Sequence, residues 1–237
     1  MLDKLNITAI LKSFSLVSFA NIIKLVISFV CIKLIAIMLG PSGVALIGQL
    51  NNFVAMIMSF SGGGIMTGIT KYVAENRDSE ERSKDYISTA FRITIYFSLT
   101  IGLLLVLLHD FISRKVLLSP DYGPVFILFG STLFLYALNT MILCLLNGYQ
   151  ELRKYVIVNL SGSSIGLFLT LLLIFPFGLI GAMISIVTTQ SITFFVSCWM
   201  IRNYPWMSWS YFSGKFNKKN WIKIYEVFTY DIDIYCV

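Results

Sequence analysis

The sequence predicts an all-α protein, a polytopic bundle of six transmembrane helices with both chain ends in the cytoplasm. Hydrophobic residues make up 57% of the 237 residues and charged residues only 13%, a composition that a soluble domain would find hard to shield from water. Six apolar segments are each long enough to cross a hydrocarbon layer of ~30 Å as a helix. The connections between them alternate between basic and nearly uncharged, which favours one fixed orientation in the membrane.

The predicted spans are apolar on every side, which argues against the alternating pattern of a β-barrel. They form a six-helix lobe over residues 1–201. A cytoplasmic linker over 202–227 follows, in which aromatic and basic residues are interleaved as in a segment that lies at lipid headgroups. The last residues, 228–237, continue neither pattern. The spans cover Phe14–Leu39, Val44–Thr70, Ile93–Leu108, Val125–Leu146, Val156–Phe175 and Leu179–Ile201.

Orientation follows from the basic residues, because Lys and Arg in short connections stay on the cytoplasmic side. Fourteen of them lie in the connections assigned to the cytoplasm, whereas Arg114 and Lys115 alone lie in those of the opposite side. The charged stretch Lys71–Arg92 is expected to be a solvated cytoplasmic helix or loop, and His109–Pro124 is the only sizeable outer loop. The formal net charge of +6 reflects this topology, and we do not interpret it as nucleic-acid binding.

Glycine sets the expected shape of several segments. The short turns Leu39–Gly43 and Pro176–Gly178 predict tight antiparallel hairpins. The run Ser61–Gly64 late in the second span predicts a bent or locally unwound helix beside a cavity, because consecutive glycines each weaken a helix by roughly 1 kcal/mol. Gly162 and Gly166 form a G-x-x-x-G pair in the fifth span, which predicts close helix packing.

Groups for catalysis or metal binding are sparse in this sequence. All twelve acidic residues fall outside the predicted spans, so a carboxylate proton relay within the membrane is not expected. The sole histidine, His109, has no second histidine with which to form a metal site, and the four cysteines show no metal-ligand or disulfide spacing. No nucleophile-elbow, phosphate-loop or dinucleotide motif stands out. We therefore expect no enzyme activity, no metal and no cofactor.

Two cations lie inside the first span, where an ammonium group costs from about 2.5 kcal/mol upward unless it faces water or a partner. Lys24 shares a helix face with Asn21 and Ser28, and this face is the first candidate for a binding cavity. Lys33 lies about 180° round the helix from Lys24. A role in binding and a position at the outer headgroups both stay open for Lys33.

Amide side chains in the second span accompany these cations. Gln49 and Asn52 lie on one side of the helix, and Asn51 is adjacent. A cavity that presents cations and amides without a carboxylate favours an anionic, hydrogen-bonding ligand such as a phosphate or a sugar. Arg92, at the cytoplasmic mouth of the third span, is placed to contribute. The candidate binding residues are thus Asn21, Lys24, Ser28, Lys33, Gln49, Asn51, Asn52 and Arg92.

The run LGPSGVALIGQLNNF from Leu39 to Phe53, followed by Gly63-Gly64-Ile65 and by Lys71-Tyr72-Val73-Ala74-Glu75, resembles the start of bacterial O-antigen translocases. These Wzx-type flippases of lipid-linked oligosaccharides include the lipid III flippases of enterobacterial common antigen, and they belong to the MATE-like multidrug/oligosaccharidyl-lipid/polysaccharide exporter superfamily. Asn147-Gly148-Tyr149-Gln150 and Arg153-Lys154-Tyr155 are similar to the family's loop between spans four and five. The resemblance covers about residues 1–225.

The resemblance implies two six-helix lobes in the bacterial inner membrane, which face each other across a central cavity and rock between inward-open and outward-open states. It implies an undecaprenyl-diphosphate-linked oligosaccharide as substrate, an O-antigen or enterobacterial common antigen repeat unit, with Lys24 at the diphosphate and Gln49, Asn51 and Asn52 at phosphate or sugar. Membrane lipids and the O-antigen polymerisation machinery of lipopolysaccharide biosynthesis are the implied partners. This chain carries the first lobe only, so we expect a truncated product or part of a longer protein.

Three other functions stay open. A drug or organic-cation exporter of the same superfamily is expected to carry an embedded carboxylate. A polytopic membrane enzyme needs a catalytic carboxylate or histidine near a span end, where only isolated residues such as Glu75, His109 and Asp110 occur. A non-transporting membrane remnant would be recognised by whether the chain accumulates stably.

Overall fold

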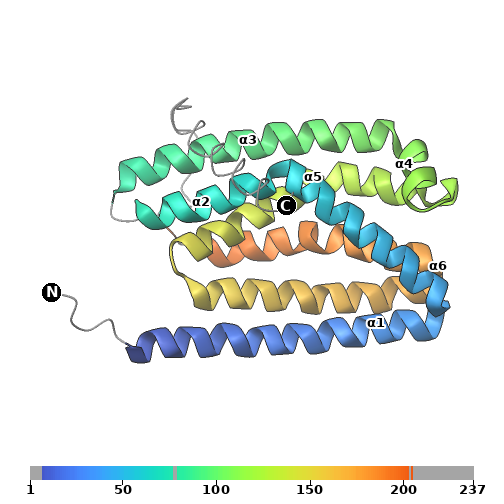
Figure 1. The fold of residues 1–237 in the computed structure, drawn as a ribbon, viewed down its shortest axis with the longest axis horizontal. Helices are drawn as coiled ribbons and strands as arrows, with labels where there is room; N and C mark the ends of the chain where they lie inside the picture. Colours follow the sequence, from blue (N-terminus) through green and yellow to red (C-terminus); the bar gives the residue numbers. More distant parts are fainter. Residues whose placement is uncertain (1–6, 77–78, 203, 205–237) are drawn as a thin grey trace, which may run out of the picture.

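The computed structural model describes residues 7–76, 79–202 and 204, and in this part of the chain every regular element is a helix (Figure 1). The predicted linker and tail at 202–237 lie outside the described residues, apart from Arg202 and Tyr204. The elements are α1 (Ile7–Met58), the π-helix η1 (Ser59–Gly63), α2 (Gly64–Glu75), α3 (Glu80–Leu107), α4 (His109–Val116), the 3-10 helix η2 (Pro120–Tyr122), α5 (Gly123–Gly148) and α6 (Leu152–Ile201).

The two longest elements, α1 and α6, each fold back on themselves at a glycine (Figure 1). The backbone of Gly40 has φ 70° and ψ −175°, and that of Gly178 has φ 55° and ψ −128°. Both φ values lie in the region that glycine adopts without steric cost, and Pro41 and Pro176 lie beside the two turns. The predicted reversals at 39–43 and 176–178 are therefore confirmed. The two halves of α6 form the predicted tight hairpin, whereas the two halves of α1 diverge from their turn (Figure 1).

Four helical stretches in the described residues are long and apolar enough to cross a membrane. Two of them are the folded-back α1 and α6, and the other two are α3 and α5. This is the architecture of a multi-pass, all-α membrane protein. The stretches are Ser15–Ser61, Ser83–Leu107, Pro120–Gly148 and Leu152–Ile201.

The glycine-rich run of the second predicted span forms the π-helix η1 between α1 and α2. A π-turn places an extra residue in the helix and weakens its regular hydrogen bonding, so the predicted local distortion is confirmed. Ser61 is fully buried there, and its hydroxyl has no hydrogen-bond partner within the described residues. A pocket of about 510 Å³ lies beside this bend, as predicted, and Phe60 of η1 lines it together with residues from the stretch 96–101 of α3. It is separate from the polar cavity described below, whose described lining residues come from other segments.

The connection between α2 and α3, predicted to be cytoplasmic, is more helical than the sequence alone indicated. Helix α3 begins at Glu80, well before the predicted span start at Ile93, and only residues 76–79 separate it from α2. Acidic residues in a first turn favour a helix start through the helix dipole, and apolar residues such as Ile87 are fully buried along the same stretch. Tyr72 of α2 stacks on Tyr86 of α3 with 5.0 Å between ring centroids, which fixes the two helices together.

The connection predicted to lie on the outer side also has regular structure. The segment predicted as a loop at 109–124 contains α4 and η2. The buried Ser113 hydroxyl of α4 donates a hydrogen bond to the carbonyl of Ser119, and Leu117 packs into the core. The segment is therefore an ordered cap on one end of the bundle.

Helix α5 is the centre of the bundle and packs against α2, α3 and α6. Phe126, Phe129 and Leu133 on α5 are fully buried. At the α3–α5 crossing the backbones of Gly102 and Gly130 approach so closely that a Cβ atom on either would lie 2.5 Å from the carbonyl oxygen of the other. Close approach of small residues is how membrane helices gain packing energy. Helix α1, by contrast, packs mainly on α6, and its first half leaves much of its surface open.

Candidate functional site

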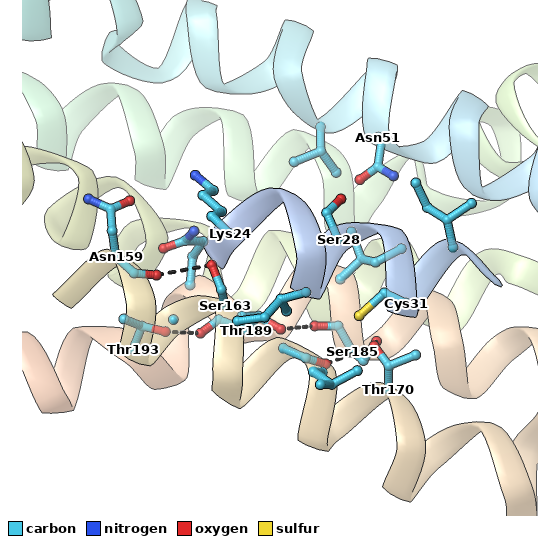
Figure 2. A pocket seen from close by; sticks show the side chains of 18 of the residues that line it. Lys24, Ser28, Cys31, Asn51, Asn159, Ser163, Thr170, Ser185, Thr189 and Thr193 are labelled. Carbon is cyan, nitrogen blue, oxygen red and sulfur yellow. Dashed lines mark hydrogen bonds between the residues drawn. The ribbon is translucent and has the colours of Figure 1, made fainter. Parts of the chain in front are cut away.

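A polar cavity of about 360 Å³ lies between α1, α5 and α6 (Figure 2). None of its described lining residues is acidic, and Lys24 is the cation among them. Apolar residues such as Ile27, Ile35 and Val54 complete the wall. The polar lining residues are Lys24, Ser28, Cys31, Asn51, Tyr136, Asn159, Ser163, Thr170, Ser185, Thr189, Gln190 and Thr193.

Lys24 lies at mid-depth of the bundle. It precedes the Gly40 turn by sixteen residues, which is about 24 Å of helix, so its ammonium group has no short route to the end of the bundle where that turn lies. Figure 2 shows Lys24, Ser28 and Cys31 along the same segment of α1. No carboxylate of a described residue lies within ion-pair distance of Lys24. Within the part of the chain that the structure describes, no carboxylate therefore balances the positive charge of the cavity.

The two halves of α6 form the opposite wall, and small residues let them pack closely. A Cβ atom on Gly162 would lie 3.3 Å from Thr193, and one on Gly166 would lie 3.2 Å from Thr189. The predicted packing role of this glycine pair is confirmed. Thr170 and Ser185 join the two halves through hydroxyl oxygens 2.8 Å apart.

A buried amide network lies behind this wall and connects α5 to α6. Asn139 of α5 is fully buried, and its Nδ2 donates to Gln190 Oε1 over 2.7 Å. The hydroxyl of Ser197, also fully buried, donates to Asn139 Oδ1 over 2.6 Å. Each of these polar groups has a partner, which removes most of the cost of burying it. Only Gln190 of the three lines the cavity.

The structure brings together part of the predicted site. Lys24, Ser28 and Asn51 line the cavity, and Asn21 lines a small adjoining pocket of about 40 Å³ together with Lys24. The amide that faces the cavity from the second half of α1 is thus Asn51.

The other four predicted residues lie outside this cavity. Lys33, Gln49 and Asn52 are exposed elsewhere on α1, and Arg92 is half-buried in α3. Lys33 is separated from Lys24, as their helical spacing predicts. A binding role for these four residues stays a prediction.

Sequence reasoning missed the contribution of α5 and of the second half of α6. Tyr136 comes from α5, and Thr189 and Gln190 come from α6. A signal was present, because Thr188-Thr189-Gln190-Ser191 is a run of four polar residues inside an apolar span. Polar residues within a membrane helix usually face the bundle interior or a cavity.

The cavity is suited to binding and offers no obvious reactive pair. In the described part of the chain no group of three His, Cys, Asp or Glu side chains is placed to hold a metal ion. The cavity hydroxyls of Ser163, Thr189 and Thr193 all donate to backbone carbonyls of their own helix. The arrangement provides one cation and many neutral hydrogen-bonding groups.

Comparison with known proteins gives the family. Residues 10–230 match the family described as "Polysaccharide biosynthesis protein". The chain belongs to this family. Over 134 residues it is 27% identical to the lipid III flippase of Escherichia coli (strain K12), and equally to that of Shigella flexneri. The aligned part is 56% of this chain and 32% of each relative. The resemblance to Wzx-type flippases is confirmed, and the relatives point to a transporter.

Solved transporters of the MOP superfamily have the same fold in one half of their length. An outward-facing multidrug MATE transporter superposes with a TM-score of 0.72 at 18% sequence identity. The superposition covers 90% of the present chain and 50% of the MATE transporter. A MOP transporter from Pyrococcus furiosus, described as having a binding pocket of reverse polarity, gives a TM-score of 0.72 at 16% identity. Here 92% of the present chain and 51% of the transporter are covered. The inward-facing MATE form gives 0.69 at 16% identity, with 86% and 48% covered. The chain thus spans about half the length of these transporters.

Proposed function

We propose that this chain forms one lobe of a flippase that moves an undecaprenyl-diphosphate-linked oligosaccharide across the bacterial inner membrane by alternating access, without bond chemistry. The observation that carries the proposal is the Lys24 ammonium group, which lies at mid-depth in a cavity whose described lining residues include no carboxylate. An unpaired cation in this position is costly unless water or an anion compensates it. A diphosphate is such an anion.

The remaining wall fits the neutral part of such a headgroup. Hydroxyl and amide groups of α6, together with Asn51 of α1, surround the cation. Sugar hydroxyls both donate and accept hydrogen bonds, so a wall of this kind contacts a repeat unit without requiring further charge. We assign Lys24 to the diphosphate, and Asn21, Ser28 and Asn51 to neighbouring phosphate or sugar oxygens.

The proposed topology has six spans with both ends in the cytoplasm. The reversals at Gly40 and Gly178 support it, since they divide α1 and α6 into two crossings each. The basic residues support the orientation, because Arg114 and Lys115 of α4 are the only two assigned to the outer side. The second lobe of the transporter supplies the opposite wall of the cavity, and the O-antigen polymerisation machinery receives the product.

A drug exporter is the second candidate, and the fold match to multidrug MATE transporters favours it. A site for organic cations is expected to present negative charge, and the described lining of this cavity carries the opposite sign. The charge of the cavity therefore supports the flippase over the drug exporter.

The test is transport in proteoliposomes by the chain alone and by the chain fused to the second lobe of a lipid III flippase. The substrate is an undecaprenyl-diphosphate-linked repeat unit, and a cationic dye is the competing substrate. We expect the fused protein to move the lipid-linked sugar and the chain alone to be inactive. Lys24→Gln is expected to lower the rate at least tenfold and Lys24→Arg to retain most of it. Lys115→Gln, at an exposed position of α4, is expected to leave the rate unchanged.

Three results would contradict the proposal. Unchanged lipid-linked sugar transport by Lys24→Gln would remove the ligand assignment. Saturable transport of the dye but not of the lipid-linked sugar would favour the exporter. Full transport by the chain alone would show that one lobe suffices.

A further inference from the structure

We propose that Gln190 is a specificity-determining residue, which presents its Nε2 amide as a fixed hydrogen-bond donor to the cavity. Asn139 and Ser197 act as positioning residues behind it. The ligand position next to Gln190 then takes an acceptor oxygen and rejects a donor. This inference deepens the proposed function and rests on it for the identity of the ligand.

The orientation of Gln190 follows from a chain of hydrogen bonds that starts at Ser197. The Ser197 hydroxyl lies 2.6 Å from Asn139 Oδ1 and 3.0 Å from the Thr193 carbonyl. A hydroxyl carries one hydrogen, and in the arrangement from which we argue that hydrogen takes the shorter contact, to Asn139. With its Oδ1 occupied, Asn139 turns its Nδ2 towards Gln190 and donates to Oε1 over 2.7 Å.

The opposite orientation of Gln190 is unfavourable while this chain holds. Turning Gln190 alone would place two NH₂ groups against each other, and Asn139 is fully buried with no access to water. Turning both amides together would require the Ser197 hydrogen to move to the Thr193 carbonyl, at the longer of its two contacts. A buried donor without an acceptor costs roughly 1–3 kcal/mol. Gln190 therefore keeps Oε1 at Asn139 and directs the two hydrogens of Nε2 to the cavity that it lines.

The other polar side chains of the α6 wall present hydrogen-bond acceptors to the cavity, in contrast to Gln190. Ser163 and Thr193 use their single hydroxyl hydrogen on the carbonyls of Asn159 and Thr189. Asn159 uses its Nδ2 on the Tyr155 carbonyl over 3.1 Å and leaves its Oδ1 available. These side chains therefore offer acceptors to the cavity, whereas Gln190 and Lys24 offer donors.

This division specifies the ligand more closely than charge does. Acceptor oxygens belong beside Gln190 and Lys24, and hydroxyl donors belong along the rest of α6. The acceptor at Gln190 has two possible sources, a phosphate oxygen and the carbonyl of an N-acetylated sugar. Both are strong acceptors without a proton to donate at neutral pH.

The orientation is tested first without ligand, in the full chain in detergent with ¹⁵N-labelled Asn and Gln. The side-chain amide signals are assigned by their loss in Gln190→Leu and Asn139→Leu. We expect the Nε2 hydrogens of Gln190 to exchange with water at least tenfold faster than the Nδ2 hydrogens of Asn139. Equal exchange rates, or slower exchange at Gln190, would overturn the proposal.

The second arm measures binding of inorganic pyrophosphate and, separately, of N-acetylglucosamine by calorimetry. Gln190→Glu keeps an acceptor for Asn139 but removes the donor and adds a negative charge, so its effect is read on the uncharged probe, for which at least a tenfold loss of affinity is expected if N-acetylglucosamine contacts Gln190. For pyrophosphate the comparison is with Gln190→Met, which removes the donor without adding charge and is expected to lower the affinity at least tenfold if a phosphate oxygen contacts Gln190. Ser197→Ala frees Asn139 to rotate, and we expect at least a threefold loss together with a smaller difference in exchange rates. The matched control is Ser191→Ala, which removes another α5–α6 hydrogen bond, from Ser191 to the Thr132 carbonyl at 3.0 Å.

The two arms separate this inference from the proposed function. Equal losses in Ser197→Ala and Ser191→Ala would mean a merely structural network and would overturn the inference. Fast exchange at Gln190 with no binding of either probe would contradict the proposed function, while the donor orientation would stand. A loss confined to one probe identifies the source of the acceptor oxygen.

Discussion

The first half of α1 and the second half of α6 line the same cavity but are held very differently. In α1, Leu25 and Phe29 are 69% and 67% exposed, whereas Ala182 and Val187 of α6 are fully buried. The polar groups differ in the same way. Those of α6 are paired through contacts such as Asn139–Gln190, whereas Lys24 of α1 has no carboxylate partner among the described residues.

The difference follows from what each kind of polar group costs to bury. A neutral hydroxyl or amide is buried at little cost once it is hydrogen-bonded, whereas an ammonium group stays costly without a counter-charge. The paired groups therefore belong on the packed helix, and the cation belongs on the helix with open surroundings. One wall of the cavity is firmly packed and the other, which carries the charge, is loosely packed.

The largest loss of stability is expected from a substitution at the α3–α5 crossing, in the centre of the packed region. Gly130→Val adds atoms where a Cβ already lies 2.5 Å from the backbone carbonyl of Gly102, and backbone yields little to overpacking. We expect a loss of about 3 kcal/mol or more, measured by reversible unfolding in mixed micelles of increasing sodium dodecyl sulfate. Gly48→Ala on α1, where a Cβ meets nothing within 4 Å, is expected to cause no loss. Similar stability of the two variants would contradict the described crossing of α3 and α5.

A pair of phenylalanines compares the two regions directly. Phe129 of α5 is fully buried, and Phe29 of α1 is 67% exposed. Phe129→Ala leaves a cavity in the packed region and is expected to cost about 3 kcal/mol. Phe29→Ala is expected to cost about 0.5 kcal/mol or less. The same unfolding titration measures both, and equal costs would show that the two regions are packed alike.

A smaller effect is expected from one hydrogen bond within the packed wall. Thr170→Val keeps the shape of the side chain but removes the contact with the Ser185 hydroxyl. Hydrogen bonds between membrane helices contribute on average about 0.6 kcal/mol, so a loss of this size is expected. The control is Ser131→Ala, whose exposed hydroxyl bonds only to the Ile127 carbonyl of its own helix. A loss in the control as large as in Thr170→Val would remove the distinction between the walls.

For the packed region, the sequence predicts the membrane-spanning helices well but not the cavity residues that these helices contribute. Apolar length gives the helices, and Gly40 and Gly178 mark the reversals because few other residues adopt their φ values. The start of α3 at Glu80 was not predicted, because its charged first turns resemble a loop in composition while Ile87 and its neighbours are buried.

The charged residue of the cavity could be predicted from the sequence, whereas most of its neutral hydrogen-bonding residues could not. Lys24 stands out in an apolar span, whereas Gln190 becomes informative only when tertiary packing brings Asn139 to it. Which residues of the second half of α1 face the cavity also depends on the geometry of the turn at Gly40. The structure directs Asn51 to the cavity, and Gln49 and Asn52 lie elsewhere. The sequence gives the spacing of these amides but not the angle at which the helix leaves the turn.

The most direct test of the account uses Cys31, which lines the cavity seven residues after Lys24, about 10 Å along the helix. With the other cysteines replaced by serine, the rates at which an anionic and a cationic methanethiosulfonate modify Cys31 are compared. Their ratio does not depend on the reactivity of the thiol itself. We predict that the anionic reagent reacts at least twofold faster and that Lys24→Gln abolishes this preference. An unreactive Cys31, or a ratio that Lys24→Gln leaves unchanged, would contradict a water-filled, electropositive cavity.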